Sequence, residues 1–150
     1  MKVAIASDHG GFSLKEELRT SLTDWGIQVL DKGCHSPESV DYVDYAAQAV
    51  EAVLGGECER AILICGTGIG MSIAANKFPG IRAALCHDHF SAQATREHND
   101  SNVLCLGARV IGSSLAESIV KVWLNTEFSG GRHQRRIDKI SAIERRFCKQ

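Results

Sequence analysis

Short apolar runs alternate with amphipathic helical patterns along the whole chain, and this alternation constrains the fold more than any other feature. Compact apolar runs predict buried strands over residues 3–6, 27–30, 61–65, 82–86 and 103–106. Strands that alternate with helices favour a parallel sheet covered by helices on both faces. We therefore expect residues 1–150 to form a single domain, with a Rossmann-like, three-layer α/β/α fold and a parallel sheet of about five strands.

The segments between the apolar runs carry helical patterns. A first helix is expected from about Ser13, because Ser13 and Glu16 have the spacing of a capping box. One face of this helix carries Leu14, Leu18, Leu22 and Trp25. Further helices are expected over residues 44–54, about 70–78, 89–98 and 113–125. The helix over 113–125 is expected to turn inward the side chains of Leu115, Ile119, Val122 and Trp123.

The C-terminal segment carries one more apolar stripe at helical spacing, made by Ile137, Ile140, Ile143 and Phe147. The other helices already suffice to cover both faces of the sheet, so this stripe needs a surface elsewhere. Symmetric dimers are the commonest oligomers and bury such faces. We therefore expect a homodimer or a tetramer, with the C-terminal helix at the dimer interface.

Charge and hydropathy exclude several classes of function. The formal net charge of -1 gives no electrostatic attraction to nucleic acid or to an anionic membrane. The N-terminal apolar run is too short for a signal peptide, and no segment approaches the roughly 20 apolar residues that cross a bilayer. The six cysteines are scattered without a CxxC pair, which is typical of reduced thiols. We expect a cytoplasmic protein that binds neither nucleic acid nor membrane.

Residues capable of chemistry gather where predicted strands end. Asp8 and His9 follow the first strand, "CGTGIG" begins at Cys65 where the third strand ends, and Arg109 follows the fifth. Ligands of open parallel sheets bind outside these carboxyl ends. The glycines let backbone N–H groups approach an anion, or an oxyanion that forms during reaction. A thiol at such a turn is suited to reactivity, although Cys65 also fits an inert core position.

Three familiar anion-binding loops do not fit this stretch. A nucleotide-binding phosphate loop needs Lys directly after its last glycine, where this chain has Met71. A dinucleotide fingerprint needs Gly or Ala at the same position and normally follows the first strand. A small tyrosine phosphatase needs Arg there to hold the phosphate. The loop therefore suits an anion but lacks the cation that each of these mechanisms uses.

Other polar clusters have weaker interpretations. His87 and His89 in "CHDHF" lie two residues apart, with no second cluster at zinc-ligand spacing, so we expect no metal site. His98 lies near a predicted helix end and could simply cap it. Arg132 and Arg136 are four residues apart, so on a helix they would share a face and could hold a phosphate between them.

Taken together, these residues resemble the family of type B ribose-5-phosphate isomerases, within the wider group that includes galactose-6-phosphate isomerase. The resemblance covers nearly the whole chain. It rests on "SDHGG", "DKG", "ICGTGIGMSIAANK", "GIRAALC", "REHNDSNVL", "GARVIG" and "GGRHQRRIDKI", in this order. It implies a metal-independent and cofactor-free interconversion of ribose 5-phosphate and ribulose 5-phosphate, in the non-oxidative branch of the pentose phosphate pathway.

The resemblance also implies catalytic roles. Cys65 matches the base that moves a proton between C1 and C2 of the sugar, and His98 matches the acid that helps to open the furanose ring. Asp8 matches a residue near the C1 and C2 oxygens. The loop that matches the one holding the enediolate oxygens consists of Gly66, Thr67, Gly68, Ile69 and Gly70. Because Met71 stands where some members carry a glutamate base, Cys65 is the candidate base here.

The remaining matches concern substrate binding. His9, Arg132 and Arg136 match contacts to the phosphate, while Asn99 and Arg109 complete the substrate shell. The resemblance further implies an active site shared between two subunits, in which Cys65 and the turn at Asp8 and His9 meet His98, Asn99 and Arg109 of the partner subunit.

Other functions remain open at this point. An isomerase of a six-carbon sugar phosphate, such as allose 6-phosphate or galactose 6-phosphate, would use the same proton transfer. A non-catalytic sugar-phosphate sensor on the same fold is disfavoured by the presence of both Cys65 and His98. A thiol-dependent phosphatase is disfavoured by Met71.

Overall fold

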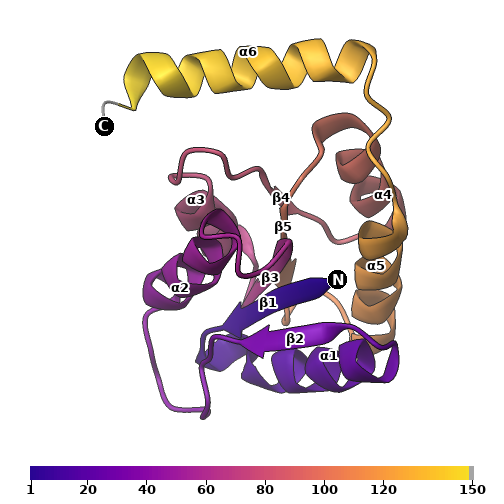
Figure 1. Cartoon of the computed structure of the whole chain (residues 1–150). Helices are drawn as coiled ribbons and strands as arrows, with labels where there is room; N and C mark the ends of the chain where they lie inside the picture. The colour runs from indigo at the N-terminus through magenta and orange to yellow at the C-terminus, as the bar shows by residue number, and fades with distance from the viewer. Residues whose placement is uncertain (149–150) are drawn as a thin grey trace.

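A five-stranded parallel sheet forms the centre of the computed structural model, which describes residues 1–148 (Figure 1). Its strands are β1 (Lys2–Ser7), β2 (Gln28–Asp31), β3 (Arg60–Cys65), β4 (Ala83–Leu85) and β5 (Val103–Gly107). They lie in the order β2-β1-β3-β5-β4, and every neighbouring pair is parallel. The parallel α/β architecture predicted from the sequence is confirmed.

Helices cover both faces of this sheet. They are α1 (Phe12–Asp24), α2 (Tyr42–Leu54), α3 (Ile69–Ala75), α4 (His89–Asn99) and α5 (Ser113–Asn125), with a short 3-10 turn over His9–Gly11. One core lies under α1, α4 and α5, and a second lies under α2 and α3. The central strands are buried on both faces, and this explains why β1, β3 and β5 read as continuous apolar runs.

Two local expectations are wrong. Ser13 does not cap α1: the helix begins at Phe12, and Glu16 instead pairs with Lys15 and Arg19. Asp8 instead caps the preceding 3-10 turn, where its carboxylate accepts a hydrogen bond from the Gly11 N–H at 3.1 Å, and α1 follows directly from this turn.

The inward face of α5 is also shifted. Leu115 is exposed, because the buried face is centred on Ala116, Ile119, Val120 and Trp123. Ile119 and Trp123 are buried as predicted, and Val122 packs at the margin of the core. The apolar pattern therefore predicted the helix correctly but placed its first inward residue one position too early.

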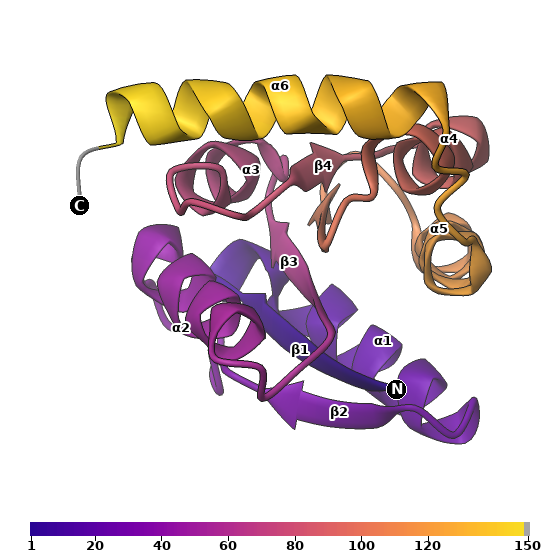
Figure 2. The ribbon, with the colours of Figure 1, turned by 45° about the horizontal axis from the view of Figure 1, so that its top comes forward.

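The last helix, α6 (Arg132–Phe147), lies across one end of the molecule, over α3, β4 and α4 (Figure 2). Of its apolar stripe, Ile137 is buried, whereas Ile143 is 60% exposed and Phe147 is 70% exposed. A groove of about 510 Å³ separates the stripe from the body of the domain, between Ile140 and Phe147 on one side and Ile81 and Ala83 on the other. Within one chain the stripe is therefore largely uncovered.

Among residues 1–148, no helix combines the length and the apolar character needed to cross a membrane.

Candidate active site

The exits of the three central strands meet at the carboxyl edge of the sheet. The Asp8 N–H donates to the Ile64 carbonyl at 3.2 Å, and the Ala108 N–H donates to the Cys65 carbonyl at 2.9 Å. After β1 the chain first builds β2 on one side and later β3 on the other, so the site lies where the strand order reverses. Ligands of open α/β sheets bind at such a point.

Cys65 is the last residue of β3, and the glycine loop that follows it curls back onto its side chain. The buried Sγ atom accepts a hydrogen bond from the Gly68 N–H at 3.1 Å. Gly68 has φ of 75°, in the left-handed region, and a Cβ atom there would lie 2.6 Å from the Leu85 side chain. Glycine is therefore required at this position for both conformation and space. The thiol and the loop, which are adjacent in sequence, form one structural unit.

Two other buried thiols, Cys86 and Cys105, have raised pKa values. Burial raises the pKa of Cys86 to about 11, with a smaller contribution from the charge of Asp88. Burial also raises the pKa of Cys105, which lies within β5. Both thiols therefore remain protonated near neutral pH and are unsuited to nucleophilic or base chemistry.

The first strand exit brings an acid and an imidazole to the same edge. Asp8 is buried, and the neighbouring Gly10 lies so close to the glycine loop that a Cβ atom on it would be 3.5 Å from the Gly66 nitrogen. His9 is exposed, and its Nδ1 atom accepts a hydrogen bond from the Val40 N–H at 3.2 Å. Asp8 and Gly10 therefore lie beside the Cys65 loop, and the exposed His9 stands between them in the chain.

The fifth strand contributes Arg109. Its N–H donates to the Gly66 carbonyl at 3.0 Å, and its side chain passes 3.5 Å from the position of a Cβ on Gly66. Arg109 therefore already lies beside the glycine loop of its own chain, which corrects the expectation that it reaches this loop from a partner. The reason is that β5 is the direct neighbour of β3 in the sheet.

His87 has a structural role that the sequence did not reveal. Its Nε2 atom accepts a hydrogen bond from the Gly107 N–H at 3.1 Å, which supports the turn that carries Arg109. Within residues 1–148, no group of three His, Cys, Asp or Glu side chains is arranged to hold a metal ion. In the "CHDHF" stretch, His87 therefore binds a backbone N–H group, and Asp88 is the N-cap of α4.

His98 and Asn99 lie elsewhere, in the last turn of α4. The Arg82 Nε donates to the Asn99 carbonyl at 2.8 Å, and Arg82 directly precedes β4, so both residues belong to the amino edge of the sheet. Five residues of β5 separate this edge from the carboxyl edge, which amounts to roughly 13 Å at the usual rise of a strand. Within one chain, His98 does not meet Cys65.

The N-terminal turn of α6 lies beside His98. The imidazole of His133 stacks on that of His98, with 4.4 Å between ring centroids and 14° between planes. Desolvation lowers the pKa of His133, and the charges of His98, Arg132 and Arg136 lower it further. Arg132 and Arg136 are both exposed.

The candidate residues therefore form two groups. The carboxyl-edge group consists of Asp8, His9, Cys65, Gly66, Thr67, Gly68, Ile69, Gly70 and Arg109. The amino-edge group consists of His98, Asn99, Arg132 and Arg136. The first group has a thiol and backbone donors, and the second has an imidazole and two guanidinium groups. The contacts of Val40, His87 and His133 were not predicted, because the sequence holds no local signal for them.

Comparison with known proteins identifies the family of the chain. The family model described as Ribose/Galactose Isomerase matches residues 3–140. Ribose-5-phosphate isomerase B of Escherichia coli is 54% identical over 145 residues, covering 97% of each chain. D-erythrulose-4-phosphate isomerase of Pectobacterium atrosepticum is 43% identical over 146 residues, covering 96% of this chain and 95% of the relative.

A solved structure extends the likeness to the fold. Ribose-5-phosphate isomerase B of Clostridium thermocellum superposes with a TM-score of 0.97 at 54% identity, covering 98% of this chain and 99% of that one. The match spans both the carboxyl-edge and the amino-edge groups. The chain is therefore an isomerase that belongs to the ribose/galactose isomerase family.

Proposed function

We propose that this chain interconverts D-ribose 5-phosphate and D-ribulose 5-phosphate through an enediolate, without a metal ion, as a step of the non-oxidative pentose phosphate pathway. The observation that supports the proposal is the hydrogen bond from the Gly68 N–H to the Cys65 Sγ, because a thiol and a backbone N–H donor then lie together at one strand exit. Aldose–ketose isomerisation needs a base for a carbon-bound proton and donors for the oxygen that becomes negative.

Ring opening is assigned to His98. It donates a proton to the furanose ring oxygen while the bond from that oxygen to C1 breaks, and a solvent water takes the proton of the C1 hydroxyl, which gives the open aldehyde. The phosphate is held meanwhile by His9, Arg132 and Arg136. This grip on the distant end of the substrate positions the reacting carbons.

Proton transfer is assigned to Cys65. Its thiolate takes the proton from C2, the electron pair forms a double bond between C1 and C2, and O1 becomes the oxyanion that the loop amides stabilise. The same thiol then returns the proton to C1, and the hydroxyl proton of O2 passes to O1. Asp8 and Thr67 lie at the loop and are assigned this exchange between the two oxygens. Asn99 and Arg109 complete the substrate shell.

The two groups require a second subunit in this scheme. In one chain they lie at opposite edges of the sheet, so a complete site forms when the carboxyl-edge group of one subunit faces the amino-edge group of its partner. The uncovered stripe of α6 supports such a homodimer, because Ile140, Ile143 and Phe147 expose apolar surface on the helix that carries Arg132 and Arg136.

Turnover of a panel of sugar phosphates tests the proposal. The purified chain is assayed with ribose 5-phosphate, erythrulose 4-phosphate, allose 6-phosphate and galactose 6-phosphate, with and without a chelator. We expect the highest kcat/KM for ribose 5-phosphate and no change on chelation. The four-carbon sugar belongs in the panel because of the name of the Pectobacterium relative. A preference for another chain length would replace the substrate but keep the chemistry, whereas no turnover of any member would contradict the enzymatic proposal.

A further inference from the structure

Residues 33–42, here called the strap, run from the end of β2 to the start of α2 and contact the carboxyl-edge group at two separate places. The Val40 N–H donates to the Nδ1 atom of His9 at 3.2 Å. Further along, the ring of Tyr42 lies against Gly70: a Cβ atom on that glycine would be 2.6 Å from the tyrosine Cζ and 3.0 Å from its Oη. One short segment therefore touches both the proposed phosphate contact and the end of the glycine loop.

The contact with His9 determines where its proton lies. A nitrogen that accepts a hydrogen bond carries no hydrogen, so in the neutral imidazole the proton must be on Nε2. His9 is exposed, and its side chain makes no other hydrogen bond within residues 1–148. Val40 thereby fixes both the rotation of the ring and its tautomer, and it leaves the Nε2–H as a donor of known direction. A phosphate oxygen is the acceptor that suits this donor.

The contact with Gly70 constrains the glycine loop. Gly70 lies in the first turn of α3 and does not have a positive φ, so its backbone conformation does not require glycine. The ring of Tyr42 fills the space that any side chain would need. Tyr42 is itself 39% exposed, so its ring is not part of the domain core. Its packing instead bears on the loop that leads from Cys65 into α3.

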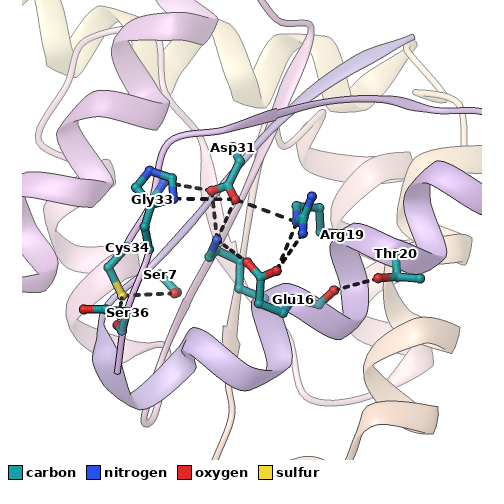
Figure 3. A network of polar contacts seen from close by, with 10 residues as sticks. Ser7, Glu16, Arg19, Thr20, Asp31, Gly33, Cys34 and Ser36 are labelled. Atoms are coloured by element: carbon teal, nitrogen blue, oxygen red, sulfur yellow. Dashed lines mark hydrogen bonds and ion pairs between the residues drawn. The ribbon is translucent and has the colours of Figure 1, made fainter. Parts of the chain in front are cut away.

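The start of the strap is held by a polar network around a fully buried lysine (Figure 3). The Lys15 Nζ lies 2.9 Å and 2.8 Å from the two carboxylate oxygens of Asp31, and 2.9 Å from the Glu16 carboxylate. Asp31 in turn accepts a hydrogen bond from the Gly33 N–H at 2.9 Å. Breaking a buried ion pair is strongly unfavourable, so this end of the strap is firmly anchored.

The anchored end is also joined to the first strand. The Ser7 N–H donates to the Gly33 carbonyl at 2.6 Å, and the Cys34 N–H donates to the Ser7 carbonyl at 2.8 Å. Ser7 directly precedes Asp8. The strap is thus fixed relative to the exit of β1 before it reaches His9 and Gly70.

We propose that the strap is a positioning element for the isomerase site: Val40 presents His9 to the phosphate as an Nε2–H donor, and Tyr42 holds the glycine loop against Cys65. This inference rests on the proposed function, since it assigns His9 to the phosphate and the loop to the enediolate. It adds two positioning residues whose effects on catalysis should be separable.

Paired variants test the two contacts separately. Val40→Pro removes the N–H, and Val40→Ala keeps it. We expect Val40→Pro to raise KM for ribose 5-phosphate by about tenfold, the loss that one hydrogen bond produces, while kcat changes little and Val40→Ala resembles the wild type. Tyr42→Ala should lower kcat by about tenfold with KM nearly unchanged, and Tyr42→Phe, which keeps the ring, should restore it. The proposal would be overturned if Val40→Pro and Tyr42→Ala each changed kcat and KM by the same factor. It would also be overturned if Tyr42→Phe had as low a kcat as Tyr42→Ala.

Nitrogen NMR of the wild-type protein provides a test that needs neither turnover nor a folded proline variant. With ¹⁵N-labelled histidine, His9 should show the Nε2–H tautomer in the free protein, and its signals should move on addition of inorganic phosphate. A dominant Nδ1–H tautomer would overturn the role given to Val40. If no sugar phosphate is turned over but the tautomer is as expected, the proposed function fails while the geometry of the strap stands.

Discussion

The sulfur of Cys65 and the N–H of Gly68 are joined by a hydrogen bond of 3.1 Å that closes the glycine loop on its own cysteine. The contact exists because Gly68 adopts a left-handed conformation with no room for a side chain. Burial raises the pKa values of two other thiols, Cys86 and Cys105. The loop contact of Cys65 and the raised pKa of Cys86 give the first two predictions.

Cys65→Ala should remove isomerisation while leaving binding in place. The base supplies about a thousandfold of the rate in reactions of this type, so kcat should fall by about that factor. The affinity for ribose 5-phosphate, measured by calorimetry, should change little because the phosphate contacts belong to other residues. Cys86→Ala serves as the matched control and should retain kcat. Near-native turnover of Cys65→Ala would show that another group is the base.

Alkylation should distinguish the thiols. In a Cys148→Ser background, which removes the exposed cysteine, iodoacetamide at pH 8 should inactivate the enzyme by labelling Cys65. Cys86, with a pKa of about 11, should not react, since its thiol stays protonated at that pH. Ribose 5-phosphate should slow the inactivation. Peptide mass mapping checks the site, and labelling of Cys86 ahead of Cys65 would contradict the assignment.

Gly68→Ala should destabilise the fold more than a matched change elsewhere. Gly26 has nearly the same φ, 78° against 75° for Gly68, but nothing lies within 4 Å of a Cβ placed on it. Gly26→Ala should therefore cost only backbone strain, about 1 kcal/mol in the free energy of unfolding. Gly68→Ala adds a clash with the Leu106 backbone and should cost about 3 kcal/mol or more, as well as activity. Urea unfolding measures both, and equal costs would show that the loop can move aside.

The fold was predictable from the sequence because the central strands are continuous apolar runs. Residues 61–65 are all buried in the structure, so the apolar run there had one interpretation. The errors arose where neighbours compete: Ser13 and Glu16 have capping-box spacing, but Asp8 caps the 3-10 turn that leads into α1, and Glu16 pairs with Lys15 and Arg19.

Contacts within the site were predictable only between residues that are adjacent in the sequence. Cys65 and its glycines adjoin in the chain, so their contact could be anticipated. The hydrogen bond from Val40 to His9 joins residues 31 positions apart, and nothing in the local pattern indicates it. The same holds for Tyr42 on Gly70, where the glycine is needed for space and not for its backbone angle.

The titration of His133 should reflect its neighbours. Its pKa lies below the ordinary value of 6.5, through desolvation and through the charges of His98, Arg132 and Arg136. Because the folded state disfavours the protonated form, the fold should be destabilised as pH falls from 6.5 through the lower folded value. In a His98→Gln variant, the NMR titration midpoint of His133 should rise towards 6.5. An unchanged midpoint would show that the stacked ring of His98 does not affect the pKa of His133.

The central claim is that each active site combines the carboxyl-edge group of one subunit with the amino-edge group of its partner. Cys65→Ala and His98→Ala chains, each inactive alone, are co-expressed with different tags, and the doubly tagged dimer is isolated. One site then inherits both defects, and the other inherits neither. The account predicts about half of the wild-type kcat if the two sites act independently. Activity no higher than that of either single mutant, in a dimer verified to contain both chains, would show that each site is built from one chain alone.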